Sequence, residues 1–200
     1  MGTENRKQGV LDRREVMKAI LDKRGDALVV TGLGSSCYDA GVHDHPNTFY
    51  LWGAMGAAAM VGLGLALAQS KRRVIVVTGD GEMLMGLGAL ATIGARKPAN
   101  LSIVVVDNEL YAETGMQPTH TARGVSLSGM AKAADFASAE TVYTEGELTK
   151  AIEAIYGTQG PVFVDVKVNN KRYPMSIKLR DGAHIKNRFR ENLLGQKAFD

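Results

Sequence analysis

The sequence predicts an α/β fold, with helices on both faces of a mainly parallel central sheet. Residues 73–78 and 101–106 form two predominantly apolar runs, as expected for parallel strands that are buried on both faces. Segments of helix length separate the strand-like runs, so strands and helices alternate along the chain. We therefore expect three layers in the order αβα, with ligands bound beyond the carboxyl ends of the strands. The chain has 200 residues, of which 45% are hydrophobic, and this suffices for one domain with a core.

The N-terminal part of the chain begins with an amphipathic helix. Apolar residues at helical spacing predict this helix over residues 12–24, and Gly25 ends it. An apolar, β-branched run predicts a strand at 27–31, and a turn rich in glycine and serine follows at 32–36. We expect a second strand at 49–52.

Residues 49–68 contain no charged side chain and match the length of a membrane helix. Glycines interrupt the stretch and alanine makes up much of the rest, so few of its side chains suit contact with lipid. We therefore predict no membrane span. We expect instead a shorter helix that is buried on all sides, at a contact between subunits. The basic residues at 71–73 suit the C-terminal end of such a helix.

The rest of the chain repeats the alternation of strands and helices. The strand at 73–78 leads into a glycine-rich segment, and a proline- and glycine-containing loop follows the strand at 101–106. The further expected elements are helices at 84–95, 127–137, 145–156 and 185–194 and strands at 140–143 and 162–168. No repeat or linker divides the chain, so residues 1–200 are expected to form one domain, with a core at about 12–168.

The charge of the chain is concentrated in a C-terminal extension, residues 169–200. This extension holds eight Lys or Arg and three acids, a charge of +5, which leaves 3 − 5 = −2 for residues 1–168. No nucleic-acid motif accompanies the basic extension, so we expect no nucleic-acid partner. The single cysteine, Cys37, excludes an intramolecular disulfide and a Cys-rich metal centre. The polar N-terminus shows no secretory signal, and we expect a cytoplasmic protein.

Polar residues follow the two clearest strands. Asp80 lies between Gly79 and Gly81 after the first, and Asn108 follows the second, 108 − 80 = 28 residues later. One helical crossover between parallel strands would bring both side chains to the same sheet edge. Carboxylate and amide oxygens suit Mg²⁺, which keeps phosphate oxygens as further ligands, and the glycines allow close approach of a ligand. A helix that begins after Gly81 would add amide groups for a phosphate.

This order of strand, Gly-Asp-Gly, helix, strand and Asn resembles the motif of thiamin-diphosphate-dependent decarboxylases, in their diphosphate-binding domain. The resemblance covers about residues 25–168. Residues 107–119 are similar to the DN-x-x-Y-x-x-TG-x-QPT stretch of the sulfopyruvate and phosphonopyruvate decarboxylase group, especially the separate β subunit of sulfopyruvate decarboxylase. The resemblance therefore implies a thiamin diphosphate site that contains Mg²⁺.

The resemblance implies a role for each matched residue. Asp80 and Asn108 would give side-chain ligands to Mg²⁺, and Leu110 a backbone carbonyl. Met55 would wedge under the thiazolium and hold the cofactor in a V shape, and the carbonyl of Gly53 would accept a hydrogen bond from the 4′-amino group. The residues expected to contact the cofactor are Gly34, Ser35, Ser36, Gly53, Met55, Gly79, Asp80, Gly81, Glu82, Asn108 and Tyr111.

The resemblance also implies a partner. In this superfamily a glutamate beside N1′ of the cofactor belongs to a pyrimidine-binding domain, and this chain has length for one α/β domain only. We therefore expect an α subunit with that domain, in a heteromer such as α2β2 or larger. The expected reaction is decarboxylation of a small 2-oxo acid to CO₂ and an aldehyde. The alternatives are a subunit of an acetolactate-synthase-like carboligase and a non-catalytic regulatory subunit, and intact Asp80 and Asn108 argue against the latter.

Two residues depart from the family pattern. Glu109 and Met116 stand where the family has glycine, and we expect them to alter the shape and charge of their loop. A sulfonated or phosphonated substrate would also need a cation. The candidates are Arg123, His120 and the basic extension.

Overall fold

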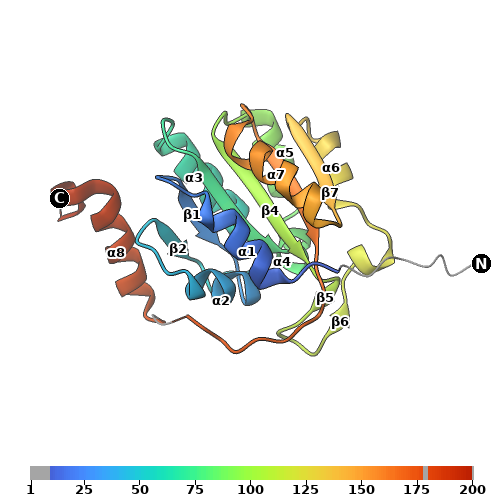
Figure 1. Cartoon of the computed structure of the whole chain (residues 1–200). Coiled ribbons are helices and arrows are strands. Elements are labelled where there is room, and N and C mark those ends of the chain that lie inside the picture. The colour runs from blue at the N-terminus through green and yellow to red at the C-terminus, as the bar shows by residue number, and fades with distance from the viewer. Residues whose placement is uncertain (1–9, 178–179, 200) are drawn as a thin grey trace, which may run out of the picture.

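Six parallel strands form the central sheet (Figure 1). The structure is a computed structural model that describes residues 10–177 and 180–199. The strands lie in the order β2-β1-β3-β4-β8-β7, and every neighbouring pair is parallel. Their bounds are β1 (Leu28–Thr31), β2 (Thr48–Tyr50), β3 (Val74–Gly79), β4 (Leu101–Asp107), β7 (Ser138–Val142) and β8 (Val162–Lys167). The predicted α/β sheet is confirmed.

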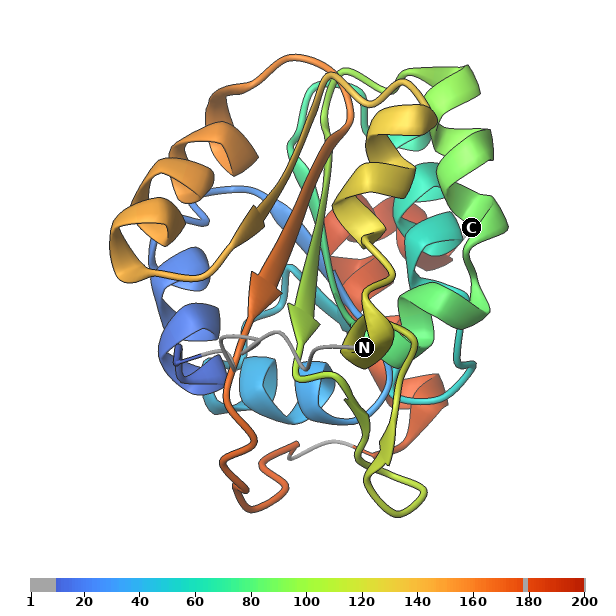
Figure 2. The same ribbon diagram turned by 90° about the vertical axis from the view of Figure 1, so that its right-hand side faces the viewer.

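Helices cover both faces of the sheet and give the three layers visible in Figure 2. One face carries α1 (Arg13–Asp22), α2 (Ser35–Val42) and α7 (Glu145–Gly157). The other carries α3 (Ala58–Ala68), α5 (Gly88–Arg96) and α6 (Leu127–Ala133). Successive strand residues point to opposite faces, so each face has its own hydrophobic cluster. The open edge at β2 is covered by α8 (Gly182–Leu194), where the rings of Phe49 and Phe189 lie 5.5 Å apart.

Short elements gather at the carboxyl edge of the strands, which is the lower edge of Figure 1. The β5–β6 hairpin lies within the segment that the sequence predicts as a loop, and β5 and β6 pair in antiparallel fashion. These elements are α4 (Asp80–Met85), β5 (Leu110–Tyr111), β6 (Gln117–Pro118) and the 3-10 helix η1 (Thr121–Arg123). A second 3-10 helix, η2 (Gly195–Phe199), follows α8.

Glycine explains two of the places where the structure differs from the predicted elements. Helix α2 begins at Ser35 within the segment predicted as a turn, because Gly34 has a φ of 67° that redirects the chain. The single helix predicted over 84–95 is instead two helices, α4 and α5. They are separated near Gly86, where a Cβ atom would lie 2.2 Å from the carbonyl oxygen of Gly56. The backbone of the Gly56 turn therefore occupies the space beside this break.

The uncharged stretch at 49–68 contains the end of β2, a turn and the 11-residue helix α3. Within residues 10–177 and 180–199, no helix has both the length and the apolar character needed to cross a membrane. One face of α3 lies close against β3, since a Cβ atom at Gly62 would be 2.1 Å from Val76 Cγ2. The opposite face exposes Met60 by 43% and Leu67 by 46%. The single chain thus buries one side of this helix, and the expected contact between subunits, which would bury the other side, stays a prediction.

Candidate functional site

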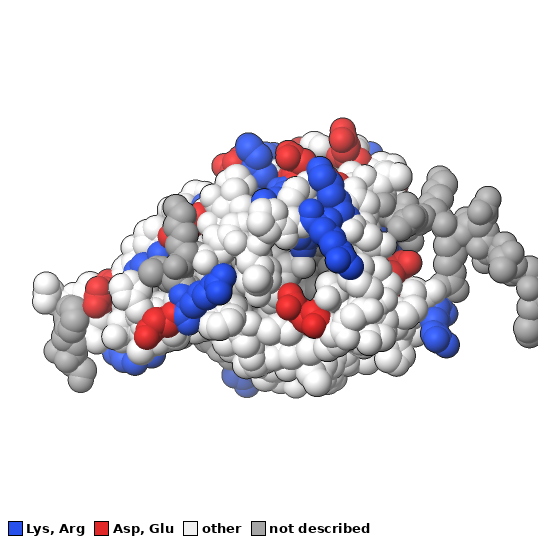
Figure 3. Space-filling model, turned by 90° about the horizontal axis from the view of Figure 1, so that it is seen from below, with Lys and Arg blue, Asp and Glu red and all other residues white. Residues whose placement is uncertain are grey.

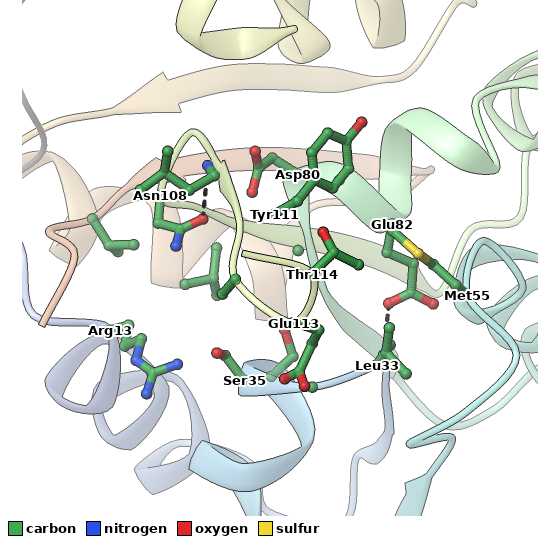
Figure 4. A pocket seen from close by; sticks show the side chains of 18 residues that line it. Arg13, Leu33, Ser35, Met55, Asp80, Glu82, Asn108, Tyr111, Glu113 and Thr114 are labelled. Atoms are coloured by element: carbon green, nitrogen blue, oxygen red, sulfur yellow. Dashed lines mark hydrogen bonds between the residues drawn. The ribbon is translucent and has the colours of Figure 1, made fainter. Parts of the chain in front are cut away.

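One cavity at the carboxyl edge of the sheet contains nearly all the residues singled out from the sequence (Figure 4). The predicted residues that line it are Gly34, Ser35, Ser36, Met55, Gly79, Asp80, Gly81, Glu82, Asn108, Leu110 and Tyr111. Gly53 does not line the cavity, although it lies two residues before Met55. The sequence did not single out the remaining lining residues, which are Arg13, Leu33, Val106, Ala112, Glu113, Thr114 and Val168.

Asp80 and Asn108 reach this cavity from two adjacent strands. The register of β3 and β4 pairs Gly79 with Val106, so both side chains follow strand ends at the same edge, as the crossover spacing predicts. Asp80 is buried, and its Oδ2 accepts a hydrogen bond from Thr119 Oγ1 at 2.5 Å. The Oδ1 of half-buried Asn108 accepts from the backbone amide of Leu110 at 3.2 Å. These bonds fix one oxygen of each group at the cavity wall.

A buried polar network lies behind Asp80. Thr121 Oγ1 donates to Asp107 Oδ1 at 2.9 Å, and Lys167 Nζ lies 2.6 Å from Asp107 Oδ2. Burial, together with the neighbouring charge of Asp107, raises the pKa of Asp80 to about 7. Burial and Asp107 also raise the pKa of Asp165 well above its ordinary value. The network thus holds more carboxyl groups than cations. A divalent cation bound by Asp80 would balance this excess of negative charge.

The donor set fits a metal that is shared with a ligand. In the part of the chain that the structure describes, no group of three His, Cys, Asp or Glu side chains is placed to hold a metal ion. Asp80 and Asn108 offer two hard oxygen donors on one wall of the cavity. Mg²⁺ is typically bound by one or two carboxylates with phosphate oxygens and water as its other ligands. A magnesium ion at this wall would therefore need a phosphate-bearing partner.

Glu82 connects three segments around the cavity. Its Oε2 accepts hydrogen bonds from the Leu33 amide and from Thr78 Oγ1, both at 2.8 Å. Burial raises the pKa of Glu82, while interactions with Thr78, Leu33 and the backbone of Gly56 and Ala58 act against this rise. The carboxylate thus faces the protein scaffold, where its Oε2 joins the ends of β1 and β3. Its Oε1 is buried without a hydrogen-bond partner among the described residues.

Tyr111 and Met55 form two further walls. The ring of Tyr111 lies so close to Gly81 that a Cβ atom there would be 2.5 Å from Tyr111 Cε1. Met55 is 36% exposed in a turn where Ala54 has a φ of 53° and Gly56 a φ of 91°. In Figure 4, Met55 lies at the opposite end of the cavity from Asn108. A sulfur-bearing apolar side chain thus marks one end and polar groups mark the other.

The two departures from the family pattern keep a backbone shape that glycine prefers. Glu109 has a φ of 63° and Met116 a φ of 64°, which is the left-handed region. Both residues thus adopt a conformation that glycine takes without strain, and the expected change in loop shape stays a prediction. Glu109 adds a carboxylate to the loop, and Lys167 Nζ lies 3.1 Å from it.

Of the candidate cations, the extension comes nearest to the cavity. His120 and Arg123 are exposed and do not line it. Lys171 and Arg172 line a neighbouring hollow, and Arg13 lines both. Figure 3 looks onto this edge and shows basic and acidic side chains near one another at its centre.

Sequence reasoning missed the groups that hold and flank the predicted residues. Thr119 and Thr121 lie in a polar loop, where no local pattern indicates a contact with Asp80. Arg13 belongs to the polar part of an amphipathic helix. Its place in the cavity depends on packing against residues about 160 positions later in the chain.

Comparison with known proteins shows which family the sequence matches. The family described as "Thiamine pyrophosphate enzyme, C-terminal TPP binding domain" matches residues 33–166. The sulfopyruvate decarboxylase subunit beta of Methanothermobacter thermautotrophicus is 36% identical over 187 residues, which cover 93% of this chain and 97% of that protein. The phosphonopyruvate decarboxylase of Streptomyces viridochromogenes is 40% identical over 144 residues, which cover 72% of this chain and 36% of that protein.

Solved structures share the fold. Benzoylformate decarboxylase from Polynucleobacter necessarius superposes with a TM-score of 0.67 at 21% identity, and the match covers 87% of this chain. This chain spans only 36% of that longer protein. The sheet and its helices are thus found as one part of a larger polypeptide.

Proposed function

This chain belongs to the thiamine pyrophosphate enzymes, as their C-terminal TPP-binding domain, and we propose that it is the diphosphate-binding subunit of a two-chain 2-oxoacid decarboxylase. The observation that carries the proposal is the cavity that unites Asp80, Asn108 and Met55 at one sheet edge. Similarity over nearly the whole length of a sulfopyruvate decarboxylase β subunit supports it. We propose sulfonated or phosphonated 2-oxo acids as the substrate class, with CO₂ and an aldehyde as products.

The metal ligands follow from the cavity walls. We assign Mg²⁺ to the side-chain oxygens of Asp80 and Asn108 and to the backbone carbonyl of Leu110. The diphosphate would lie against Gly79, Gly81, the backbone of Glu82 and the start of α2 at Gly34, Ser35 and Ser36. A divalent cation there would keep Asp80 ionised despite its burial.

Met55 and Gly53 would act on the organic part of the cofactor. Thiamin diphosphate, when bound, supplies an electron sink for loss of CO₂ from a 2-oxo acid. Met55 would support the cofactor from below, and Gly53 would offer its carbonyl from the same turn. Tyr111 would close the cavity over Gly81. Because Gly86, which follows α4, packs closely against the backbone of Gly56, these contacts would be held in a fixed relation to the metal site.

We further propose that the working enzyme is a heteromer in the cytoplasm. No glutamate of this chain is assigned to N1′ of the cofactor, so an α subunit with a pyrimidine-binding domain would supply it. Apolar side chains near the cavity support such a contact, since Trp52 is 37% exposed and Met85 67% exposed. Burial of exposed apolar groups is a main source of affinity between subunits.

The test compares this chain alone with the chain co-expressed with an α subunit from a neighbouring reading frame. Both samples are saturated with thiamin diphosphate and Mg²⁺, and CO₂ release is followed from sulfopyruvate, phosphonopyruvate and simple 2-oxo acids. We expect turnover only in the complex. Substantial turnover by the isolated chain would contradict the division of the site. A ligated product in place of an aldehyde would favour the carboligase alternative.

A further inference from the structure

Arg13 is a buried cation whose positive charge is only partly neutralised by a neighbouring carboxylate. It is 8% exposed, and its Nε is buried without a hydrogen-bond partner among the described residues. The same Nε forms an ion pair with Asp39 Oδ2, which lies 3.4 Å from it. The same carboxylate already accepts a hydrogen bond from Arg14 Nε at 3.0 Å. One buried carboxylate thus faces two guanidinium groups, and positive charge remains at this position.

Contacts from the far end of the chain hold Arg13 at the cavity wall. Leu11 forms a parallel bridge with Val168, directly beyond the end of β8, so α1 begins at the carboxyl edge of the sheet. The ring of Tyr173 lies 5.3 Å from the Arg13 guanidinium carbon, and its hydroxyl donates to Asp12. Arg13 is therefore fixed before any ligand binds, which lowers the entropy that binding would cost.

The cavity opposite Arg13 suits an anion. The first amides of the eight-residue helix α2 begin at Ser35, and no side chain caps them. Figure 4 shows the Arg13 guanidinium on the side of Ser35, at the other end of the cavity from Met55. Asn108 lies on the same side of the cavity as Arg13, and Asp80 lies between that side and Met55. The end remote from Met55 thus holds a candidate metal ligand and a cation.

We infer that Arg13 binds the terminal phosphate of the diphosphate, at the end of the cavity remote from Met55. The inference rests on the proposed function and adds to it a residue that distinguishes a diphosphate from a monophosphate. A guanidinium group presents two parallel N–H donors that match two phosphate oxygens. Terminal phosphate oxygens would give a second anionic partner to a guanidinium group whose Nε lies 3.4 Å from the carboxylate of Asp39.

The carboxylate of Glu113 occupies the position that the terminal phosphate would take. It lies on the exposed β5–β6 hairpin, and a Cβ atom at Gly34 would be 2.7 Å from its Oε1. Its carboxylate therefore stands over the start of α2, where a phosphate would enter. Binding requires this exposed side chain to turn toward solvent, and Glu113→Gln should strengthen diphosphate binding a few-fold.

The experiment is calorimetric titration of the full chain, in its α-subunit complex, with three probes in Mg²⁺. The probes are thiamin diphosphate, thiamin monophosphate and inorganic diphosphate. Arg13→Gln should weaken binding of both diphosphates roughly ten- to hundredfold, the value of a lost charge-assisted contact, and change monophosphate binding less than about threefold. Arg96→Gln, at an exposed arginine that ends α5, is the matched control and should change none of the three.

The outcomes separate this inference from the proposed function. Equal diphosphate affinity in wild type and Arg13→Gln would overturn the role of Arg13, while a loss in Asp80→Ala in the same assay would preserve the proposed function. Equal weakening of all three probes would make Arg13 structural and overturn the inference. Wild-type protein that binds neither diphosphate would overturn both. If Arg13→Gln fails to fold, Arg13→Lys keeps the charge without the planar pair of donors and should still weaken diphosphate binding selectively.

Discussion

Replacing Lys167 by methionine should destabilise the fold by about 3–5 kcal/mol at pH 8. Lys167 ends β8 with its side chain 10% exposed, and its Nζ lies 2.6 Å from the fully buried carboxylate of Asp107. Burial acts to lower the pKa of Lys167, but Asp107 and Asp165 outweigh it and keep the amine charged. Methionine keeps an unbranched apolar side chain that is one atom shorter, and it removes the charge. Asp107 would then be a buried charge with no cation beside it, which is the costly case.

The size of the loss should depend on pH. Without Lys167, the pKa of Asp165, which burial and Asp107 already raise, rises further in the folded state than in the unfolded state. A carboxyl group with a raised folded pKa gives stability that is present at low pH and is lost as the pH rises through that pKa. The deficit of Lys167→Met should therefore be largest at pH 8 and smaller at pH 6.

Urea denaturation at both pH values measures this effect. A loss of 3–5 kcal/mol corresponds to a fall of about 6–20 °C in Tm for a chain of this size. Lys132→Met, at an exposed lysine of α6, is the control and should cost less than about 0.5 kcal/mol. A loss below about 1 kcal/mol for Lys167→Met, or an equal loss at both pH values, would refute the account of a charge-compensating lysine.

Four further outcomes follow from the structure. Asp80→Ala removes a hard ligand, so calorimetry of the assembled enzyme in Mg²⁺ should detect no thiamin diphosphate binding, and unchanged affinity would show the metal assignment to be wrong. In wild type, the pKa of Asp80 near 7 means that Mg²⁺ affinity should fall as the pH drops from 8 to 6, and a flat titration series would contradict this. Met55→Ala should lower kcat more than cofactor affinity, whereas equal activity would reduce Met55 to a packing residue. Gly94→Ala would place a Cβ atom 1.7 Å from the carbonyl oxygen of Ala134, so thermal unfolding should show a loss of about 1–3 kcal/mol, and an unaltered Tm would argue against this close contact.

Strands β3 and β4 were predictable because an apolar run buried on both faces has few other structures open to it. Helix α2 was not, because its small and polar residues carry little helical pattern and its start depends on the positive φ of Gly34. The break between α4 and α5 likewise depends on a close contact of Gly86 with a distant turn. Local sequence cannot encode such a contact by itself.

Much of the candidate site was predictable for a different reason. Asp80 and Asn108 follow strands whose parallel pairing brings their ends together, so chain order alone places them at one edge. Gly53 was placed with Met55 from the motif, yet only Met55 lines the cavity. Arg13 was absent from the prediction because the bridge to Val168 and the ring of Tyr173 are non-local. The sides of α3 that pack against its own chain could not be predicted from its composition, since composition alone does not say which side of a helix faces the sheet.

The bridge between Leu11 and Val168 bears on when this protein becomes able to bind a ligand during its synthesis. The two residues are separated by 168 − 11 = 157 positions, so α1 is made long before the strand extension that fixes it. Contacts of such high sequence separation form late, because the chain must first close a large loop. A nascent chain that has already folded β1, β3 and β4 would therefore present Asp80 and Asn108 without Arg13 in place. Tight ligand binding would then become possible only after the ribosome has synthesised Val168 and Tyr173, which hold Arg13 in place.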